Sequence, residues 1–323
     1  MITYLGDKID IRLAAFIGIV FAFAATCFLL QKFSGLLPTD QGREYAHDGK
    51  LSAGKPRGAG FIFVLVFLVA AVLFIGIERE MVIYLILVAA AMMTGFLDDC
   101  SKAPWGEYKK GLLDLIIAVM VAVTFLNFNS NAVDLMLFKT TVSVPPVVFG
   151  VLIVILVWVS VNVTNCSDGV DGLSGTLTIV TLLSIYVLDR MKGTDENYNY
   201  LILLFVICLL GYLWFNATPS KLMMGDAGSR AMGLFISIAV LKMGSPFLYV
   251  LLALVLILDG GLGLIKVSLL RFLKIKILTN VRTPLHDHVR KVWGWSNTQT
   301  VYRFAIIQIM IAVGVVYMVS LLA

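Results

Sequence analysis

Residues 81–102 read MVIYLILVAAAMMTGFLDDCSK, an apolar run that ends in two neighbouring aspartates and, three residues later, a lysine. A helix of roughly 17–25 apolar residues crosses the hydrocarbon core of a bilayer. Carboxylates inside hydrocarbon are costly, so Asp98 and Asp99 should lie at the membrane surface. A charged cluster in this position is either a solvated helix end or part of a functional site.

The whole chain has the composition of a membrane protein. Of its 323 residues, 60% are hydrophobic and only 14% are charged, against about 45–50% and about 25% in soluble domains. We therefore expect an all-α polytopic integral membrane protein, with a single transmembrane domain over residues 1–323. The candidate spans are 11–30, 58–77, 81–97, 112–127, 147–164, 173–188, 199–215, 231–243, 247–270 and 301–322.

The distribution of basic residues predicts the orientation. Loops after the odd-numbered spans hold 16 of the 25 Lys and Arg residues, and the opposite side holds seven. By the positive-inside rule these loops are cytoplasmic, and ten spans then place both termini outside. The net charge of +5 follows from this topology and from attraction to membrane lipid head groups, so it implies no nucleic-acid partner.

The polar strings fall in the same cytoplasmic loops, although only Lys and Arg were used to assign the topology. We therefore expect a site on the cytoplasmic face. The strings hold Asp98, Asp99 and Lys102 in the second loop, Asn162, Asn165, Asp168 and Asp171 in the third, Asn216 and Asp226 in the fourth, and His286 and His288 in the fifth.

The third and fourth loops have the chemistry of a ligand or cation site. The turn DGVDG (168–172) carries two carboxylates and no Lys or Arg, although Asp and Gly also form ordinary turns. Asp226 precedes the eighth span, where it is either a helix N-cap or a ligand that holds Mg²⁺ against a phosphate.

The remaining candidates lie in basic or interrupted segments. His286 and His288 do not share a helix face, which disfavours a zinc pair and favours a phosphate clamp over a plain basic patch. Lys55 is the preferred candidate of the first loop. Asp259, followed by three glycines within four residues, interrupts the ninth span, either as a bend that opens a groove for a lipid chain or as a packing site.

Taken in order from about 48 to 290, the strings DDxxK, NxxNxxDGxDG, GDxGS and TPLHxH resemble those of the polyprenyl-phosphate N-acetylhexosamine-1-phosphate transferases. TPLHDH is similar to the TPLHHH of the phospho-N-acetylmuramoyl-pentapeptide transferases within that superfamily. The resemblance implies a multi-pass enzyme of the bacterial plasma membrane that has ten spans and faces the cytoplasm. Its implied reaction is the Mg²⁺-dependent transfer of phospho-N-acetylmuramoyl-pentapeptide from UDP-MurNAc-pentapeptide to undecaprenyl phosphate, giving lipid I and UMP in peptidoglycan biosynthesis.

The resemblance also implies roles for residues. Asp226 would be the metal ligand, Asp98 would deprotonate or orient the lipid phosphate with support from Asp99, and His286 would contact the phosphates. The implied substrate-binding residues are Lys55, Lys102, Asn162, Asn165, Asp168, Gly169, Asp171, Asn216, Met223 and His288. The sequence is compatible with direct attack or with double displacement through an aspartate, and with a homodimer.

Several positions depart from the family pattern. Asp287 replaces the middle histidine, Met223 stands where phenylalanine is common, and KPRGAG (55–60) reduces a longer motif. A lysine expected near Asp114 is absent, which leaves Lys109 and Lys110 as substitutes.

Two alternative functions stay open at the sequence level. A sister transferase that uses UDP-N-acetylglucosamine would share every carboxylate. A secondary transporter would instead need its substrate site near the bilayer midplane.

Overall fold

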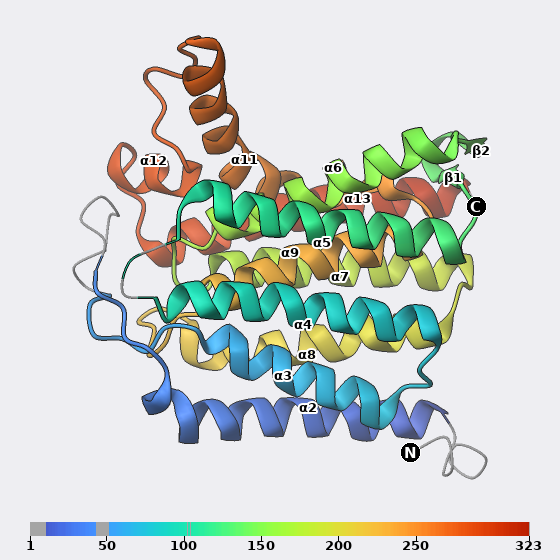
Figure 1. The fold of residues 1–323 in the computed structure, drawn as a ribbon, viewed down its shortest axis with the longest axis horizontal. Coiled ribbons are helices and arrows are strands. Elements are labelled where there is room, and N and C mark those ends of the chain that lie inside the picture. The colour runs from blue at the N-terminus through green and yellow to red at the C-terminus, as the bar shows by residue number, and fades with distance from the viewer. Residues whose placement is uncertain (1–10, 43–51, 102, 104, 323) are drawn as a thin grey trace.

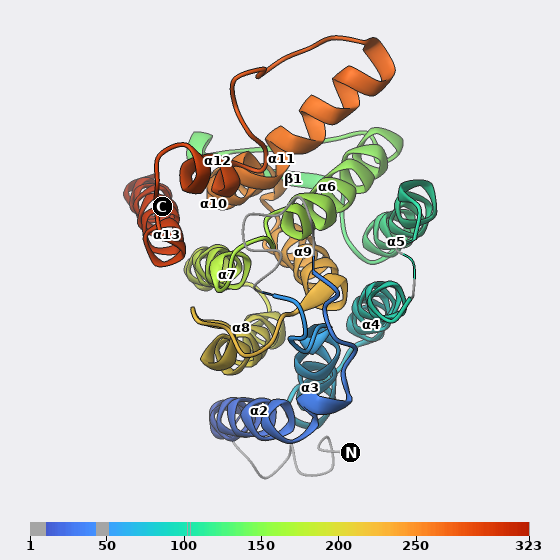
Figure 2. The same ribbon diagram turned by 90° about the vertical axis from the view of Figure 1, so that its left-hand side faces the viewer.

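The structure is a computed structural model that describes residues 11–42, 52–101, 103 and 105–322. It is a helical bundle in which most helices run in nearly the same direction (Figure 1), and an end view places α9 among the others (Figure 2). The main helices are α2 (Ile11–Phe33), α3 (Ala59–Phe74), α4 (Arg79–Asp99), α5 (Glu107–Phe128), α6 (Pro146–Cys166), α7 (Leu173–Lys192), α8 (Glu196–Asn216), α9 (Gly225–Lys242), α10 (Tyr249–Leu252), α11 (Leu254–Ser268), α12 (Leu285–Lys291) and α13 (Asn297–Leu322). Short helical turns cover Ser34–Leu36, Met136–Phe138, Pro246–Leu248 and, as a π-helix, Leu269–Leu273.

The helices confirm an all-α polytopic class. Within the described ranges, seven are long and apolar enough to cross a membrane: α2, α4, α5, α6, α7, α8 and α13. The other three expected ranges also hold helices, but these are short, charged near their ends, or bent. The helix α3 has 16 residues, α9 carries charged residues near its ends, and the segment of α10 and α11 is bent.

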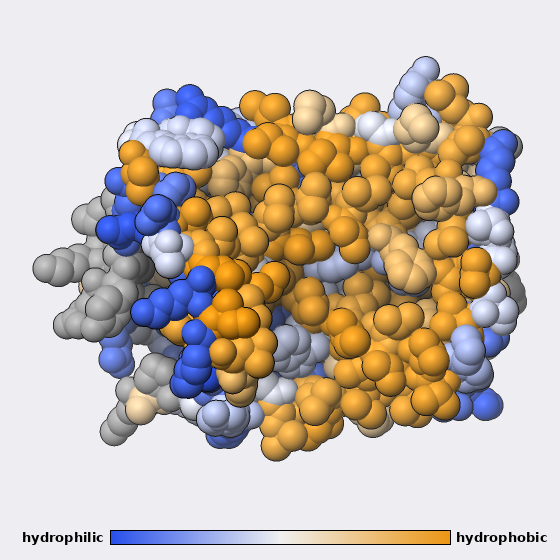
Figure 3. Space-filling view, turned by 90° about the horizontal axis from the view of Figure 1, so that it is seen from above, coloured by the Kyte–Doolittle hydropathy of each residue, from blue (hydrophilic) through white to orange (hydrophobic). Residues whose placement is uncertain are grey.

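The surface matches this class. On the face seen in Figure 3, a broad hydrophobic band covers the middle and hydrophilic residues gather at the two ends. Large apolar side chains such as Ile86, Ile116 and Ile306 are exposed in the middle of their helices. Exposed apolar side chains of this kind are what transmembrane helices present to lipid.

The helix α9 forms the centre of the bundle. Every residue from Gly225 to Leu241 is buried, and the helix packs against α3, α4, α6 and α7. Its first half, GDAGSRAMG (225–233), consists largely of small residues, which allow neighbouring backbones to approach closely. Asp226 is thereby placed where three helices meet.

Two glycines on the neighbouring helices are needed for this approach. A Cβ atom added at Gly60 of α3 would lie 2.0 Å from the backbone nitrogen of Gly228, and one at Gly95 of α4 would lie 2.3 Å from the backbone oxygen of Asp226. No larger residue fits at either position without moving α9. The glycines therefore set the position of Asp226 relative to the end of α4.

The ninth expected span is broken, and the break lies before the glycines rather than at them. The segments Pro246–Leu252 and Leu254–Leu273 meet at 88° across Ala253, and α11 then projects from the bundle (Figure 2). Gly260 is instead a packing site, because a Cβ atom there would lie 2.2 Å from the backbone oxygen of Val163. The expectation of a bend at the glycines was wrong, and that of a packing site is confirmed.

The end of the bundle opposite α12 holds a short hairpin and the end of α13 (Figure 1). Strands β1 (Ala132–Leu135) and β2 (Thr140–Ser143) pair antiparallel, with Ala132 opposite Ser143. Beside them Lys242, the last residue of α9, forms a 2.8 Å ion pair with Glu80 of α4. This contact ties the far end of α9 to the bundle.

Candidate active site

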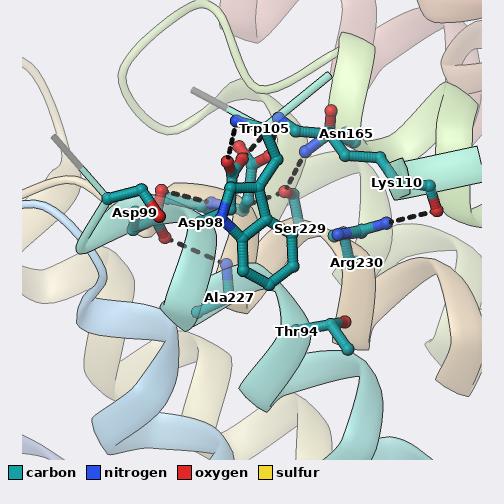
Figure 4. Close-up of polar contacts among 12 residues, drawn as sticks. Thr94, Asp98, Asp99, Trp105, Lys110, Asn165, Ala227, Ser229 and Arg230 are labelled. Carbon is teal, nitrogen blue, oxygen red and sulfur yellow. Dashed lines mark hydrogen bonds and ion pairs between the residues drawn. The ribbon is translucent and has the colours of Figure 1, made fainter. Parts of the chain in front are cut away.

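The two aspartates that end α4 lie against the start of α9. The carboxylate of Asp99 accepts hydrogen bonds from the backbone nitrogens of Asp226 at 3.2 Å and Ala227 at 3.1 Å (Figure 4). Backbone N–H groups at a helix start lack helical partners and attract anions. Asp99, and not Asp226, is therefore the group that satisfies this helix end, and the N-cap interpretation of Asp226 was wrong.

Arg57 links the first loop to these carboxylates. Its Nε atom lies 2.9 Å from Asp99 Oδ1, its Nη2 atom 3.3 Å from Asp226 Oδ1, and its Nη1 atom 3.5 Å from Asp40 Oδ1. Burial by itself lowers the pKa of Arg57, but Asp99, Asp226, Asp40 and Asp168 raise it by more. The guanidinium thus stays charged, which makes Arg57 a central cation that the preference for Lys55 had missed.

Lys110 supplies the second cation. Its ammonium forms ion pairs with Asp98 and with Asp226, the latter at 3.1 Å. The side chain is 29% exposed, whereas that of Asp226 is 9% exposed. Lys109, the other lysine considered, lies over the indole ring of Trp105 at 3.3 Å from its centroid. The structure therefore selects Lys110 as the lysine that faces the carboxylates.

The loop between α6 and α7 is held against the segment before α9. Asn216 accepts a hydrogen bond from the backbone nitrogen of Gly172 at 2.8 Å and donates one to the backbone oxygen of Leu222 at 2.9 Å. Both functional groups of this amide bond the protein itself, so Asn216 shapes the site. Asn165, near the end of α6, links that helix to α9, because it donates to Ser229 Oγ at 2.9 Å (Figure 4).

Asp171 and Lys55 meet on one side of this loop. The carboxylate of Asp171 accepts from the backbone nitrogen of Ser220 at 3.3 Å and lies 3.9 Å from the Lys55 ammonium. Lys55 also donates to Ser220 Oγ at 3.0 Å. Both side chains keep about a quarter of their surface exposed, so they remain available to a ligand.

His286 is oriented by a carboxylate from the projecting helix. Its Nδ1 atom lies 2.8 Å from Asp259 Oδ2, and its backbone nitrogen donates to Asp259 Oδ1 at 2.7 Å. Because a carboxylate can only accept, Nδ1 carries the proton in this contact. A Cβ atom at Gly169 would lie 2.3 Å from Nε2, so the second nitrogen faces the DGVDG loop. The pairing of Asp259 with His286 was not predicted.

Comparison with known proteins identifies the family of this chain. The sequence model of glycosyl transferase family 4 matches residues 81–244. A phospho-N-acetylmuramoyl-pentapeptide-transferase of Treponema pallidum (strain Nichols) is 42% identical over 86% of this chain and 82% of the relative. This chain belongs to the phospho-N-acetylmuramoyl-pentapeptide transferase family. Relatives of the same printed name in Helicobacter pylori (strain Shi470) and a Wolbachia species of Drosophila simulans are 27% and 26% identical, over 91% and 80% of this chain and 90% and 82% of the relatives.

One departure from the transferase pattern, Asp287, has a charged partner in the structure. Asp287, in the place of a histidine, forms a 2.7 Å ion pair with Arg290. Arg290 is buried and also donates to Asn297 and to the backbone oxygen of Gly169. It therefore ties α12 to α13 and to the DGVDG loop.

Other predicted members of the transferase site lie apart from the carboxylates or bond elsewhere. His288 accepts from the backbone nitrogen of Arg282 and contacts the Trp293 ring. Asn162 donates to the backbone of its own helix. Met223 pairs through its main chain with the segment around Arg57. Lys102 lies outside the described residues.

The donor set at the centre suits a hard cation only in part. Asp98 and Asp226 share Lys110, and Asp99 and Asp226 share Arg57, so positive charge is held between carboxylate oxygens. Among the described residues, no three His, Cys, Asp or Glu side chains are grouped closely enough to hold a metal alone. Mg²⁺ commonly uses one or two carboxylates and takes its other ligands from substrate and water, which this set allows.

Proposed function

We propose that this protein transfers phospho-N-acetylmuramoyl-pentapeptide from UDP-MurNAc-pentapeptide to undecaprenyl phosphate, giving lipid I and UMP. The observation that carries the proposal is that two cations join carboxylates from two separate motifs: Arg57 pairs with Asp99 and Asp226, and Lys110 pairs with Asp98 and Asp226. Phosphoryl transfer depends mainly on positioning and charge neutralisation, which a cluster of this kind supplies. The 42% sequence identity to the Treponema pallidum relative supports the muramoyl substrate.

The proposed setting is the bacterial plasma membrane, with ten spans, both termini outside and the site at the cytoplasmic surface. The excess of Lys and Arg in the odd-numbered loops supports this orientation. The arrangement of the bundle agrees with it, because α13 ends at the far end from α12 (Figure 1).

In the proposed reaction an oxygen of the lipid phosphate attacks the β-phosphorus of the donor. The bond between that phosphorus and the bridging oxygen breaks, and UMP leaves with the bridging oxygen. Asp98 lies in the last turn of α4 and would orient the lipid phosphate and take its proton if one is present. Lys110 and Arg57 would neutralise the phosphate oxygens as UMP departs.

We assign Asp226 as the residue that would hold Mg²⁺ together with donor phosphate oxygens. The ion would neutralise charge on the diphosphate. The remaining residues would bind the rest of the donor. Lys55, Asp168 and Asp171 would contact the nucleotide end, and His286 would contact a phosphate through Nε2.

The alternatives are less well supported. The relatives named above all carry the muramoyl name, which favours that donor over UDP-N-acetylglucosamine. A transporter needs polar groups near mid-depth, whereas Asp98, Asp99, Asp226 and Lys110 all lie at the start or end of their helices.

The test is UMP release by purified protein with undecaprenyl phosphate and Mg²⁺, with UDP-MurNAc-pentapeptide or UDP-GlcNAc as donor. Release from the muramoyl donor alone, lost with chelator and restored by Mg²⁺, is the expected result. Release only from UDP-GlcNAc would move the protein to the sister function, and no release from either would contradict the proposed activity.

A further inference from the structure

Helices α5 and α9 carry two opposite-charge pairs, one helical turn apart. Lys110 of α5 contacts Asp226 of α9 at 3.1 Å. Four residues further along each helix, Asp114 Oδ1 lies 2.5 Å from Arg230 Nη2. Residues four apart lie on the same helix face. The two helices therefore contact each other through two ion pairs. In the first pair α5 supplies the cation, and in the second α5 supplies the carboxylate.

The two ion pairs differ in their exposure to solvent. The side chain of Lys110 is 29% exposed, whereas those of Asp114 and Arg230 are only 4% and 3% exposed. Arg230 also donates from Nη2 to the backbone oxygen of Lys110 at 3.3 Å. The buried pair thus holds the main chain at the very residue whose ammonium enters the site (Figure 4).

The reversed charges specify one alignment of the two helices. α5 packs mainly against α4 and α6, and these long side chains reach from it to α9. A shift of one turn would set Lys110 opposite Arg230, or Asp114 opposite Asp226. Both arrangements bring like charges together, which the observed alignment avoids.

We propose that Asp114 and Arg230 are positioning residues that hold the Lys110 ammonium between Asp98 and Asp226. The inference rests on the proposed function, since it concerns the cation of that site. It also accounts for the carboxylate at position 114, near which the resemblance predicted a lysine. In this chain the cation comes from Lys110, one turn earlier, and Asp114 supports it through Arg230.

The decisive variant is the double substitution Asp114→Asn with Arg230→Gln, which removes both charges and leaves neither one buried alone. Misplacing a catalytic group by about 1 Å can cost on the order of 100-fold in rate. We expect kcat for UMP release to fall at least about tenfold, with donor KM changed less than about threefold. The thermal unfolding midpoint should be closer to wild type than that of Asp114→Asn alone, which leaves Arg230 unpaired.

The matched control is Glu80→Gln with Lys242→Gln, which removes a largely buried ion pair between α4 and the far end of α9. It should lower the unfolding midpoint without the tenfold loss of kcat. The variant Arg230→Lys keeps the charge but replaces a planar fork with a single ammonium, and we expect a severalfold lower kcat in well-folded protein. The proposal is overturned if the double variant, or Arg230→Lys should the double variant fail to fold, keeps kcat within twofold of wild type. Inactive wild-type protein would instead contradict the proposed function.

Discussion

The backbone nitrogen of Asp226 donates a hydrogen bond to the carboxylate of Asp99 at 3.2 Å. The end of α4 therefore caps the start of α9, and the distance between the two motifs is set by a direct bond between them. Because this bond uses only the backbone of Asp226, the Asp226 side chain is left to face Arg57 and Lys110. One carboxylate caps the helix, and the other faces the two cations.

Replacing Asp99 should separate its capping role from its charge. Asp99→Ala loses the acceptor for two backbone amides and should destabilise the protein by about 1–2 kcal/mol. Asp99→Asn keeps an acceptor and should lose less stability, although both variants release Arg57 and lose activity. Thermal unfolding and UMP release measured together test this, and equal destabilisation by Asn and Ala would contradict the capping role.

Asp98→Asn should abolish turnover and leave nucleotide binding largely intact. General-base catalysis contributes about 10²–10⁴-fold, and the amide can neither accept a proton nor pair strongly with Lys110. The measurements are kcat for UMP release and calorimetric binding of the UDP-linked donor. Near-normal turnover would show that Asp98 is not the base.

The two neighbouring lysines provide a matched comparison. Lys110→Gln removes the ammonium that Asp98 and Asp226 share, and kcat should fall by about 10²-fold or more. Lys109→Gln removes only a contact with the Trp105 ring, worth about 1 kcal/mol when exposed, and should stay within about threefold of wild type. A larger effect at Lys109 would reverse the assignment.

Asp259 and His286 should act as a unit. Asp259→Asn removes the charge that fixes the His286 tautomer, and loss of such an orienting partner commonly costs about 10–100-fold. In the His286→Ala background the same change should cost little more, because the oriented ring is already absent. The kcat values of the four proteins in this cycle provide the check, and additive losses would show that the two residues act separately.

Gly169→Ala should reduce activity by crowding His286. The added Cβ atom would lie 2.3 Å from Nε2, so the ring or the DGVDG loop must move. The control is Gly111→Ala in α5, where nothing lies within 4 Å of the new methyl group and helix propensity improves by about 1 kcal/mol. Unchanged kcat for Gly169→Ala, measured beside this control, would show that the loop tolerates the displacement.

The class of fold could be predicted from the sequence because hydropathy is a local property. An apolar run that ends in Asp98 and Asp99 indicates a span and its surface end wherever it packs. The position of Asp226 at a helix start was also readable from GDAGS. In contrast, the bend at Ala253 could not be located, because the glycines after Asp259 proved to serve helix packing.

The sequence by itself determined which ionisable residues gather at the ends of spans, and the order of their motifs identified the family. Only the tertiary structure decided which of them meet. Lys110 rather than Lys109 faces Asp226, Asp259 orients His286, and Arg230 pairs with Asp114. Each of these contacts joins residues distant in the chain, and each depends on the rotation and register of two packed helices. Those quantities follow from how the helices of the whole bundle pack together and from no single segment.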